Sequence, residues 1–268
     1  MEGAGVRLKR VFGFHEAPKF DPFLLLDHFG SDNPDDYMAG FPWHPHRGIE
    51  TITYMLDGRV EHGDSLGNQG VIESGDVQWM TAGSGIIHQE MPKESEGLMM
   101  GFQLWANLPS HQKMMHPRYR DVKRNTIPEV ELESGVRARV ICGEIAGTRG
   151  PVQDIVTEPE YLDVEMASGK TFSHDIKEDH TVFAYVFEGS GAFGVDKVTV
   201  ESGHLVLFDE GSEVLIDSGD EGLRFLLISG KPIGEPVAWY GPIVMNTREE
   251  LETAFREYRN GTFIKKGK

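Results

Sequence analysis

The stretch GFPWHPHRGIETITYMLDGRVEHGDSLGNQGVIESGDVQWMTAGSGIIHQEMP, residues 40–92, contains two short polar motifs, His44-Pro45-His46 and His88-Gln89-Glu90. Residues two apart on an extended chain point to the same face, so each motif can direct two metal-binding groups into one interior. A proline biases the residue before it toward an extended conformation, which favours strands here. Two such strands, side by side in a small barrel, would bring three imidazoles and one carboxylate together.

The rest of the chain has the sequence pattern of an all-β protein. Its 32 glycines and 14 prolines are spread along the chain, as expected for many short strands joined by turns. Alternation of β-branched residues predicts a strand from residue 49, and apolar runs predict strands at 20–30 and 98–108. The polar segment 111–130 is expected to connect two halves, because strand patterns restart at about residue 136.

One α-helix is predicted near the C-terminus. Thr247 and Glu250 have the spacing of a capping box, and Leu251, Ala254, Phe255 and Tyr258 then follow a helical stripe. The helix is therefore expected over residues 248–259, with its stripe buried against a barrel. We expect two domains, a metal-binding barrel at 1–133 and a second barrel at 134–268 that includes this helix.

The two halves share a skeleton of strands and glycines. The spacing of Gly75 and Gly83 is repeated by Gly203 and Gly211. Counting from such glycines without gaps places four residues opposite His44, His46, His88 and Glu90, respectively: Asp175, Lys177, Ile216 and Ser218. Lysine and isoleucine cannot replace imidazoles at a divalent metal, so the second barrel is predicted to be metal-free.

Composition limits the partners and the compartment. The net charge of −17 opposes binding to nucleic-acid phosphates, and no run approaches the roughly 20 apolar residues of a membrane helix. With one cysteine, Cys142, the chain can form no internal disulfide. The first residues, MEGAGVRLKRVF, contain no apolar run of signal-peptide length, and we therefore expect a cytoplasmic protein.

These motifs resemble the pirin family of the cupin superfamily. The resemblance rests on FPWHPHRGIETITYMLDG and GDVQWMTAGSGIIHQEMP, together with DPFLLLDHF, GFQLWANLP and GPIVMNTREE, and it covers essentially the whole chain. It implies two tandem jelly-roll barrels, the second degenerate. It also implies iron held by the residues matching His44, His46, His88 and Glu90. Cupins commonly take their carboxylate from the first motif, which would be Glu50, whereas pirins use the glutamate matching Glu90.

Other polar residues are candidates for supporting the metal ligands. Glu50 follows His46 by four residues, so a regular strand would direct it inward, where it could hydrogen-bond near the ligands. Asp27 and Gln103 interrupt apolar strands, and they are either ordinary hydrogen-bonded barrel residues or groups that line the metal pocket. His62 lies in a turn-rich hairpin and is expected to be exposed.

Two functions from different classes follow from the resemblance. The first is a quercetin 2,3-dioxygenase type of enzyme, in which Fe(II) binds a flavonol-like substrate and dioxygen, and Glu90 acts as the general base. The second is a non-enzymatic, iron- and redox-dependent regulatory protein that binds a protein partner. The ligand set does not exclude Mn, Ni, Co, Cu or Zn. A sugar isomerase is less consistent with the sequence. Its phosphorylated substrates would need arginine or lysine near the metal, and Arg47 is the only obvious basic residue near the ligands.

Overall fold

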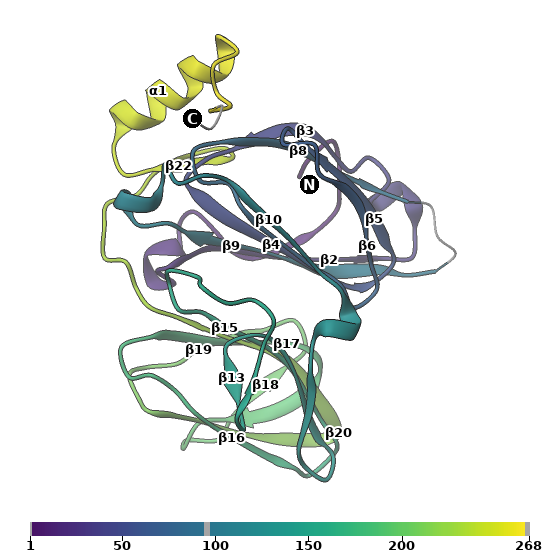
Figure 1. Ribbon diagram of the computed structural model, residues 1–268. Helices are drawn as coiled ribbons and strands as arrows, with labels where there is room; N and C mark the ends of the chain where they lie inside the picture. Colours follow the sequence, from purple (N-terminus) through teal and green to yellow (C-terminus); the bar gives the residue numbers. More distant parts are fainter. Residues whose placement is uncertain (1, 94–96, 266–268) are drawn as a thin grey trace. The chain divides into compact units, whose positions relative to one another are not determined.

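The computed structural model describes residues 2–93 and 97–265 and is built almost entirely from β-strands (Figure 1). The described residues contain one α-helix, α1 (Arg248–Arg259), which confirms the predicted all-β class with a C-terminal helix. By its internal contacts the chain divides into two compact units, residues 1–124 with 233–268 and residues 125–232.

The first unit contains two main β-sheets. Phe23, Leu25, Ile49, Ile52 and Phe102 lie on its strands and are almost fully buried, as alternating apolar positions require. One sheet has the order β1 (Lys9–Phe12), β2 (Phe23–Ser31), β9 (Met99–Asn107), β4 (Ile49–Asp57), β7 (Val77–Thr81), β10 (Arg118–Val122). The other has the order β3 (Phe41–His46), β8 (Ile86–Pro92), β5 (Arg59–Asp64), β6 (Gln69–Glu73).

The C-terminal segment packs on this first unit. It contains the hairpin of β21 (Ala238–Tyr240) and β22 (Ile243–Met245), followed by α1. Ala254 and Phe263 are buried in one cluster with Ile243 and Met245, and Ile87 of β8 packs against that cluster. The expected division at residues 133 and 134, with the helix in the second domain, therefore differs from the grouping of contacts.

An ion pair and a capping box hold α1 in place. The guanidinium of Arg47, which is 2% exposed, donates to the Glu257 carboxylate at 2.8 Å and to the carbonyl of Phe263 at 2.9 Å. Thr247 and Glu250 form the predicted capping box. Because Arg47 directly follows the first histidine motif, the helix is tied to the part of the chain that carries this motif.

The second unit is built around one eight-stranded sheet and a short hairpin. Its core contains Phe172, Ile216 and Phe225, which are almost fully buried. The sheet path is β11 (Glu129–Glu133), β12 (Val136–Cys142), β15 (Glu160–Met166), β20 (Glu213–Gly230), β17 (Thr181–Phe193), β18 (Val198–Glu201), with β16 (Thr171–Asp175) on β20 and β19 (Leu205–Leu207) on β17. The hairpin is β13 (Glu144–Ile145) and β14 (Thr148–Arg149). Four 3₁₀ turns complete the described elements: Ala17–Lys19, Pro34–Asp36, Ser110–Gln112 and Arg124–Thr126.

The connecting segment is more regular than its polar sequence indicates. Residues 111–130 include strand β10, which pairs with β7 over five residues from Arg118–Thr81 to Val122–Val77. The pairing gives the backbone amides of this polar segment hydrogen-bond partners in the sheet. The boundary between the two units falls within this segment, directly after Arg124.

The strand register corrects part of the internal alignment. His44 pairs with His88 across β3 and β8, whereas Ile216 pairs with Phe172 across β16 and β20. The residue corresponding to His44 is therefore Phe172, not Asp175. Two residues separate β3 from β4, but five separate β16 from β17, so a count without gaps is wrong by three positions.

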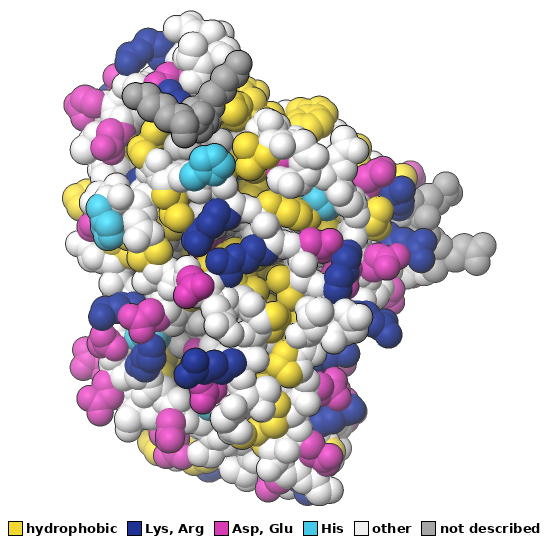
Figure 2. Space-filling model, in the orientation of Figure 1, with side chains coloured by type: hydrophobic (Ala, Val, Ile, Leu, Met, Phe, Trp, Pro, Cys, Tyr) yellow, Lys and Arg dark blue, Asp and Glu magenta, His cyan; other side chains and the backbone are white. Residues whose placement is uncertain are grey.

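The surface of the described residues carries both signs of charge. Figure 2 shows acidic and basic side chains interspersed over the face in view. No helix within residues 2–93 and 97–265 is long and apolar enough to cross a membrane.

Replacing Ile216 by alanine tests the core of the second unit. Ile216 is fully buried, so Ile216→Ala is expected to lower the free energy of unfolding by about 2–5 kcal/mol without changing metal content. Urea denaturation and elemental analysis measure the two quantities. The control Val198→Ala, at a 59% exposed position, should change stability by less than about 0.5 kcal/mol. Metal loss in Ile216→Ala without unfolding would contradict a metal-free second barrel.

Candidate metal centre

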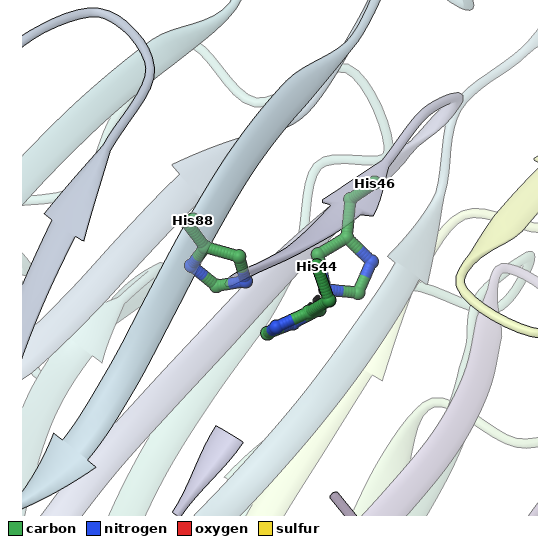
Figure 3. Close-up of side chains that lie close together, drawn as sticks. All are labelled: His44, His46 and His88. Carbon is green, nitrogen blue, oxygen red and sulfur yellow. Dashed lines mark hydrogen bonds between the residues drawn. The ribbon is translucent and has the colours of Figure 1, made fainter. Parts of the chain in front are cut away.

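Three histidines converge between two neighbouring strands of the first unit. His44 and His46 lie on β3, His88 lies opposite His44 on β8, and Figure 3 shows their rings turned toward one another. One ligand atom from each imidazole lies within 4.8 Å of the others, and no other such group of three or more metal-binding side chains occurs in the described part of the chain. The i, i+2 spacing on extended strands produces this convergence.

Backbone carbonyls fix the tautomers of two of these rings. The Nδ1 of His44 lies 2.9 Å from the carbonyl oxygen of Pro42, and the Nδ1 of His46 lies 3.0 Å from that of Pro242. Each Nδ1 must therefore carry a proton and donate it, which leaves the lone pair on Nε2. The two Nε2 atoms are 3.0 Å apart. Two facing lone pairs at this distance repel each other unless a proton or a cation lies between them.

His88 supplies a further indication of a cation site. It is 1% exposed, and neither of its ring nitrogens has a hydrogen-bond partner. Burial lowers the pKa values of His46 and His88 well below the ordinary value and lowers that of His44 as well, so all three imidazoles are neutral at pH 7. Neutral, converging imidazoles with unpaired nitrogens fit a divalent transition metal.

The Glu90 carboxylate lines a cavity together with His44 and His46, and it accepts a hydrogen bond from Thr53. Glu90 follows His88 by two residues on β8, and the hydroxyl of Thr53 lies 2.9 Å from its Oε1. Burial raises the pKa of Glu90 to about 7, because the carboxylate loses hydration that the Thr53 hydrogen bond only partly replaces. Glu90 is not one of the residues whose ligand atoms lie within 4.8 Å of one another.

Asp27 and Gln103 line the same cavity, whereas Glu50 does not. Asp27 is paired with Arg10, and Gln103 lies 2.7 Å from the Thr53 hydroxyl. The expectation that Glu50 faces inward is wrong, because Gly48, with φ of +78°, interrupts the regular alternation between β3 and β4. Glu50 instead accepts a hydrogen bond of 2.6 Å from Thr81.

The cavity beside the histidines has a volume of about 760 Å³, which is within the usual range for a small-molecule site. His44, His46, Glu90 and Gln103 supply polar groups to its wall. Most of the remaining wall is aromatic or aliphatic. Its apolar members include Leu8, Phe14, Leu25, Phe29, Phe41, Pro42, Trp105, Trp239, Tyr240 and Pro242. A planar aromatic molecule suits such a wall, since rings pack on rings.

Two features of the site escaped the sequence analysis. His62 is 3% exposed rather than at an exposed turn, and its ring stacks on Tyr119 with centroids 4.7 Å apart. The Pro242 carbonyl that orients His46 comes from 196 residues further along the chain. His62 pairs with Glu90 across β5 and β8, and no sequence signal indicates this pairing or a backbone acceptor such as Pro242.

Comparison with known proteins identifies relatives of both halves. The Pirin family matches residues 5–106, and the family described as the Pirin C-terminal cupin domain matches residues 161–264. A Pseudomonas aeruginosa protein provisionally named a quercetin 2,3-dioxygenase is 48% identical, covering 97% of this chain and 93% of its own. A pirin-like protein of Caulobacter vibrioides is 45% identical, covering 98% and 94%. The crystal structure of a quercetin 2,3-dioxygenase from Acinetobacter baumannii has a TM-score of 0.90 at 35% identity, covering 98% and 93%.

The raised pKa of Glu90 predicts a pH-dependent effect on stability. With a folded pKa of about 7, above the ordinary 4.5, the folded state is penalised where the group is ionised, so the penalty is full above pH 7 and vanishes near pH 4.5. In metal-free protein, Glu90→Gln should therefore raise the free energy of unfolding at pH 8 by about 3 kcal/mol, and the gain should shrink to about 1 kcal/mol at pH 5. Urea titrations of chelator-treated protein at both pH values measure it. A gain that is independent of pH would contradict desolvation of Glu90.

Proposed function

The chain belongs to the pirin family, as its motifs predict, and on this premise we propose that it is a metal-dependent dioxygenase of the quercetin 2,3-dioxygenase type. The observation that carries the proposal is the group of three neutral imidazoles, two of which, those of His44 and His46, line a cavity with a mostly apolar wall. We propose Fe(II) as the metal and His44, His46, His88 and Glu90 as its ligands.

The contacts around the ligands support this assignment. The carbonyls of Pro42 and Pro242 hold two rings with Nε2 directed at the shared space, and His88 has no other partner for its nitrogens. Glu90 lies on the same face of β8 as His88, within the same cavity wall. With one carboxylate and three neutral imidazoles, a divalent ion would retain one positive charge, which favours an anionic oxygen of the substrate.

In the proposed reaction, Glu90 acts on the hydroxyl group next to the carbonyl of a flavonol. The aromatic wall, including Trp105 and Phe41, orients the flat substrate and excludes water from it. Glu90 takes the hydroxyl proton as general base, and the substrate becomes an electron-rich anion. When bound, iron would supply open positions at which substrate and dioxygen meet.

The overall conversion uses one flavonol and one dioxygen and yields a depside and carbon monoxide. The proton held by Glu90 returns to the product, so the reaction is neutral in protons. Thr53 assists this transfer, because its hydroxyl lies 2.9 Å from Glu90 and 2.7 Å from Gln103. Ionised Glu90 accepts a hydrogen bond from the Thr53 hydroxyl, whereas protonated Glu90 can donate to that hydroxyl, which then donates to Oε1 of Gln103.

Removing a histidine tests the ligand assignment. His44→Ala and His88→Ala should each lower metal content by more than about tenfold, because each removes a nitrogen donor. Elemental analysis after dialysis measures it, and His204→Ala, at an exposed position of the second unit, is the control that should retain full metal. Stoichiometric metal in both site variants would refute the assignment.

Turnover of quercetin tests the activity. Protein loaded with ferrous iron and quercetin without oxygen should bleach the flavonol absorption band when oxygen is admitted. Glu90→Gln should lower kcat per bound metal by about 100- to 10,000-fold, because it removes the base. The control Glu61→Gln changes an exposed carboxylate on β5 and should leave kcat unaltered. Absence of bleaching with metal bound would reject this substrate and leave the regulatory function as the alternative.

A further inference from the structure

A row of four polar side chains crosses the sheet beside the three histidines. Arg10 of β1 is paired with Asp27 of β2, Asp27 with Gln103 of β9, and Gln103 with Thr53 of β4. Strands lie about 4.8 Å apart, so the row extends about 14 Å from Thr53, which contacts Glu90, to Arg10. Directly opposed residues share one face of the sheet, and three of the four line the large cavity.

Apolar side chains border this row on both sides. On one side of the row, two residues from Asp27 and Gln103, Leu25 of β2 is paired with Trp105 of β9. Phe29 of β2 lies two residues from Asp27 on the other side. All three line the cavity. The cavity therefore has an apolar wall with a single polar line along it, which is the arrangement that fixes the orientation of a flat ligand.

The charges at the far end of the row are already matched. Arg10 donates to both oxygens of Asp27, at 2.9 Å each, and forms an ion pair with Glu2 at 3.0 Å. Among the lining residues, three carboxyl groups, those of Glu2, Asp27 and Glu90, accompany the single guanidinium. An anionic substituent at this end would meet a neutralised cation and excess negative charge, whereas a hydroxyl group could donate to a carboxylate oxygen.

We propose that the polar row determines substrate specificity, selecting an uncharged planar aromatic molecule whose hydroxyl group, remote from the metal, donates a hydrogen bond to Asp27. This inference rests on the proposed function for the position of the metal-bound end. Arg10 acts as a positioning residue, because its two parallel hydrogen bonds fix the Asp27 carboxylate while each oxygen retains a free lone pair. Aromatic carboxylates and phosphate esters are disfavoured by the same charges.

The test compares quercetin with 3-hydroxyflavone, which lacks every remote hydroxyl. Dissociation constants are measured without oxygen on metal-loaded protein, from quenching of the fluorescence of Trp105 and Trp239 in the cavity wall. The wild-type protein should bind quercetin at least about tenfold more tightly, since a hydrogen bond to a charged acceptor is lost with 3-hydroxyflavone. Asp27→Ala should abolish this preference by weakening quercetin binding alone.

A matched control separates recognition from general damage. Asp163 is 3% exposed and accepts two hydrogen bonds from Arg224, at 3.0 and 2.8 Å, but it lies in the second unit. Asp163→Ala therefore removes a buried ion pair of the same kind and should leave the quercetin preference unchanged. If Asp27→Ala does not fold, Asp27→Asn keeps the side-chain shape and should still reduce the preference, because the acceptor is no longer charged.

A carboxylated 3-hydroxyflavone gives a readout that loss of structure would not produce. It should bind the wild-type protein more weakly than 3-hydroxyflavone does, and bind Asp27→Ala more tightly than it binds the wild type, because Arg10 is then released. Equal affinities of the wild type for quercetin and 3-hydroxyflavone, or a preference retained in Asp27→Ala, would overturn the inference. Selective binding of quercetin without turnover would support the inference and reject only the dioxygenase function. Turnover of quercetin without selective binding would support the dioxygenase function and reject the inference.

Discussion

The pairing of β3 with β8 is the constraint on which the site depends. It places His44 opposite His88, and the period of two along each strand then directs His46 and Glu90 to the same face. A slip of one residue would turn every one of these side chains outward. Ile87 resists such a slip, because its backbone bonds to Ser65 on one side while its side chain packs under the C-terminal segment.

The C-terminal segment completes the site from a distance in sequence. The Pro242 carbonyl orients His46, and Trp239 and Tyr240 form part of the cavity wall. Arg47, buried between Glu257 and the ring of Phe263, couples the end of the first histidine motif to α1. The candidate metal centre is therefore built from both ends of the chain, and the hairpin and helix that follow the second unit belong to the first unit.

Local rules predicted the local part of this structure. The convergence of His44, His46 and His88 followed from alternation along two strands, and the helix followed from its capping box and apolar stripe. Prediction failed where an irregular backbone intervened: Gly48 turned Glu50 to the opposite face, and the longer loop after β16 shifted the internal alignment by three residues. Burial of His62 depends on Tyr119, from a strand 57 residues later, which no local pattern reports.

Electrostatics explains why the arrangement of the three histidines and Glu90 favours a cation. Two Nε2 lone pairs face each other at 3.0 Å, His88 is buried without partners, and burial raises the pKa of Glu90 to about 7. Each of these costs arises from unmatched negative potential in one small space. A divalent ion bound to these nitrogens and to the carboxylate would offset all of these costs together and would thereby stabilise the fold. The two ends of the cavity therefore differ: the imidazoles of His44 and His46 present unmatched lone pairs at one end, whereas Arg10 and Asp27 are paired with each other at the other.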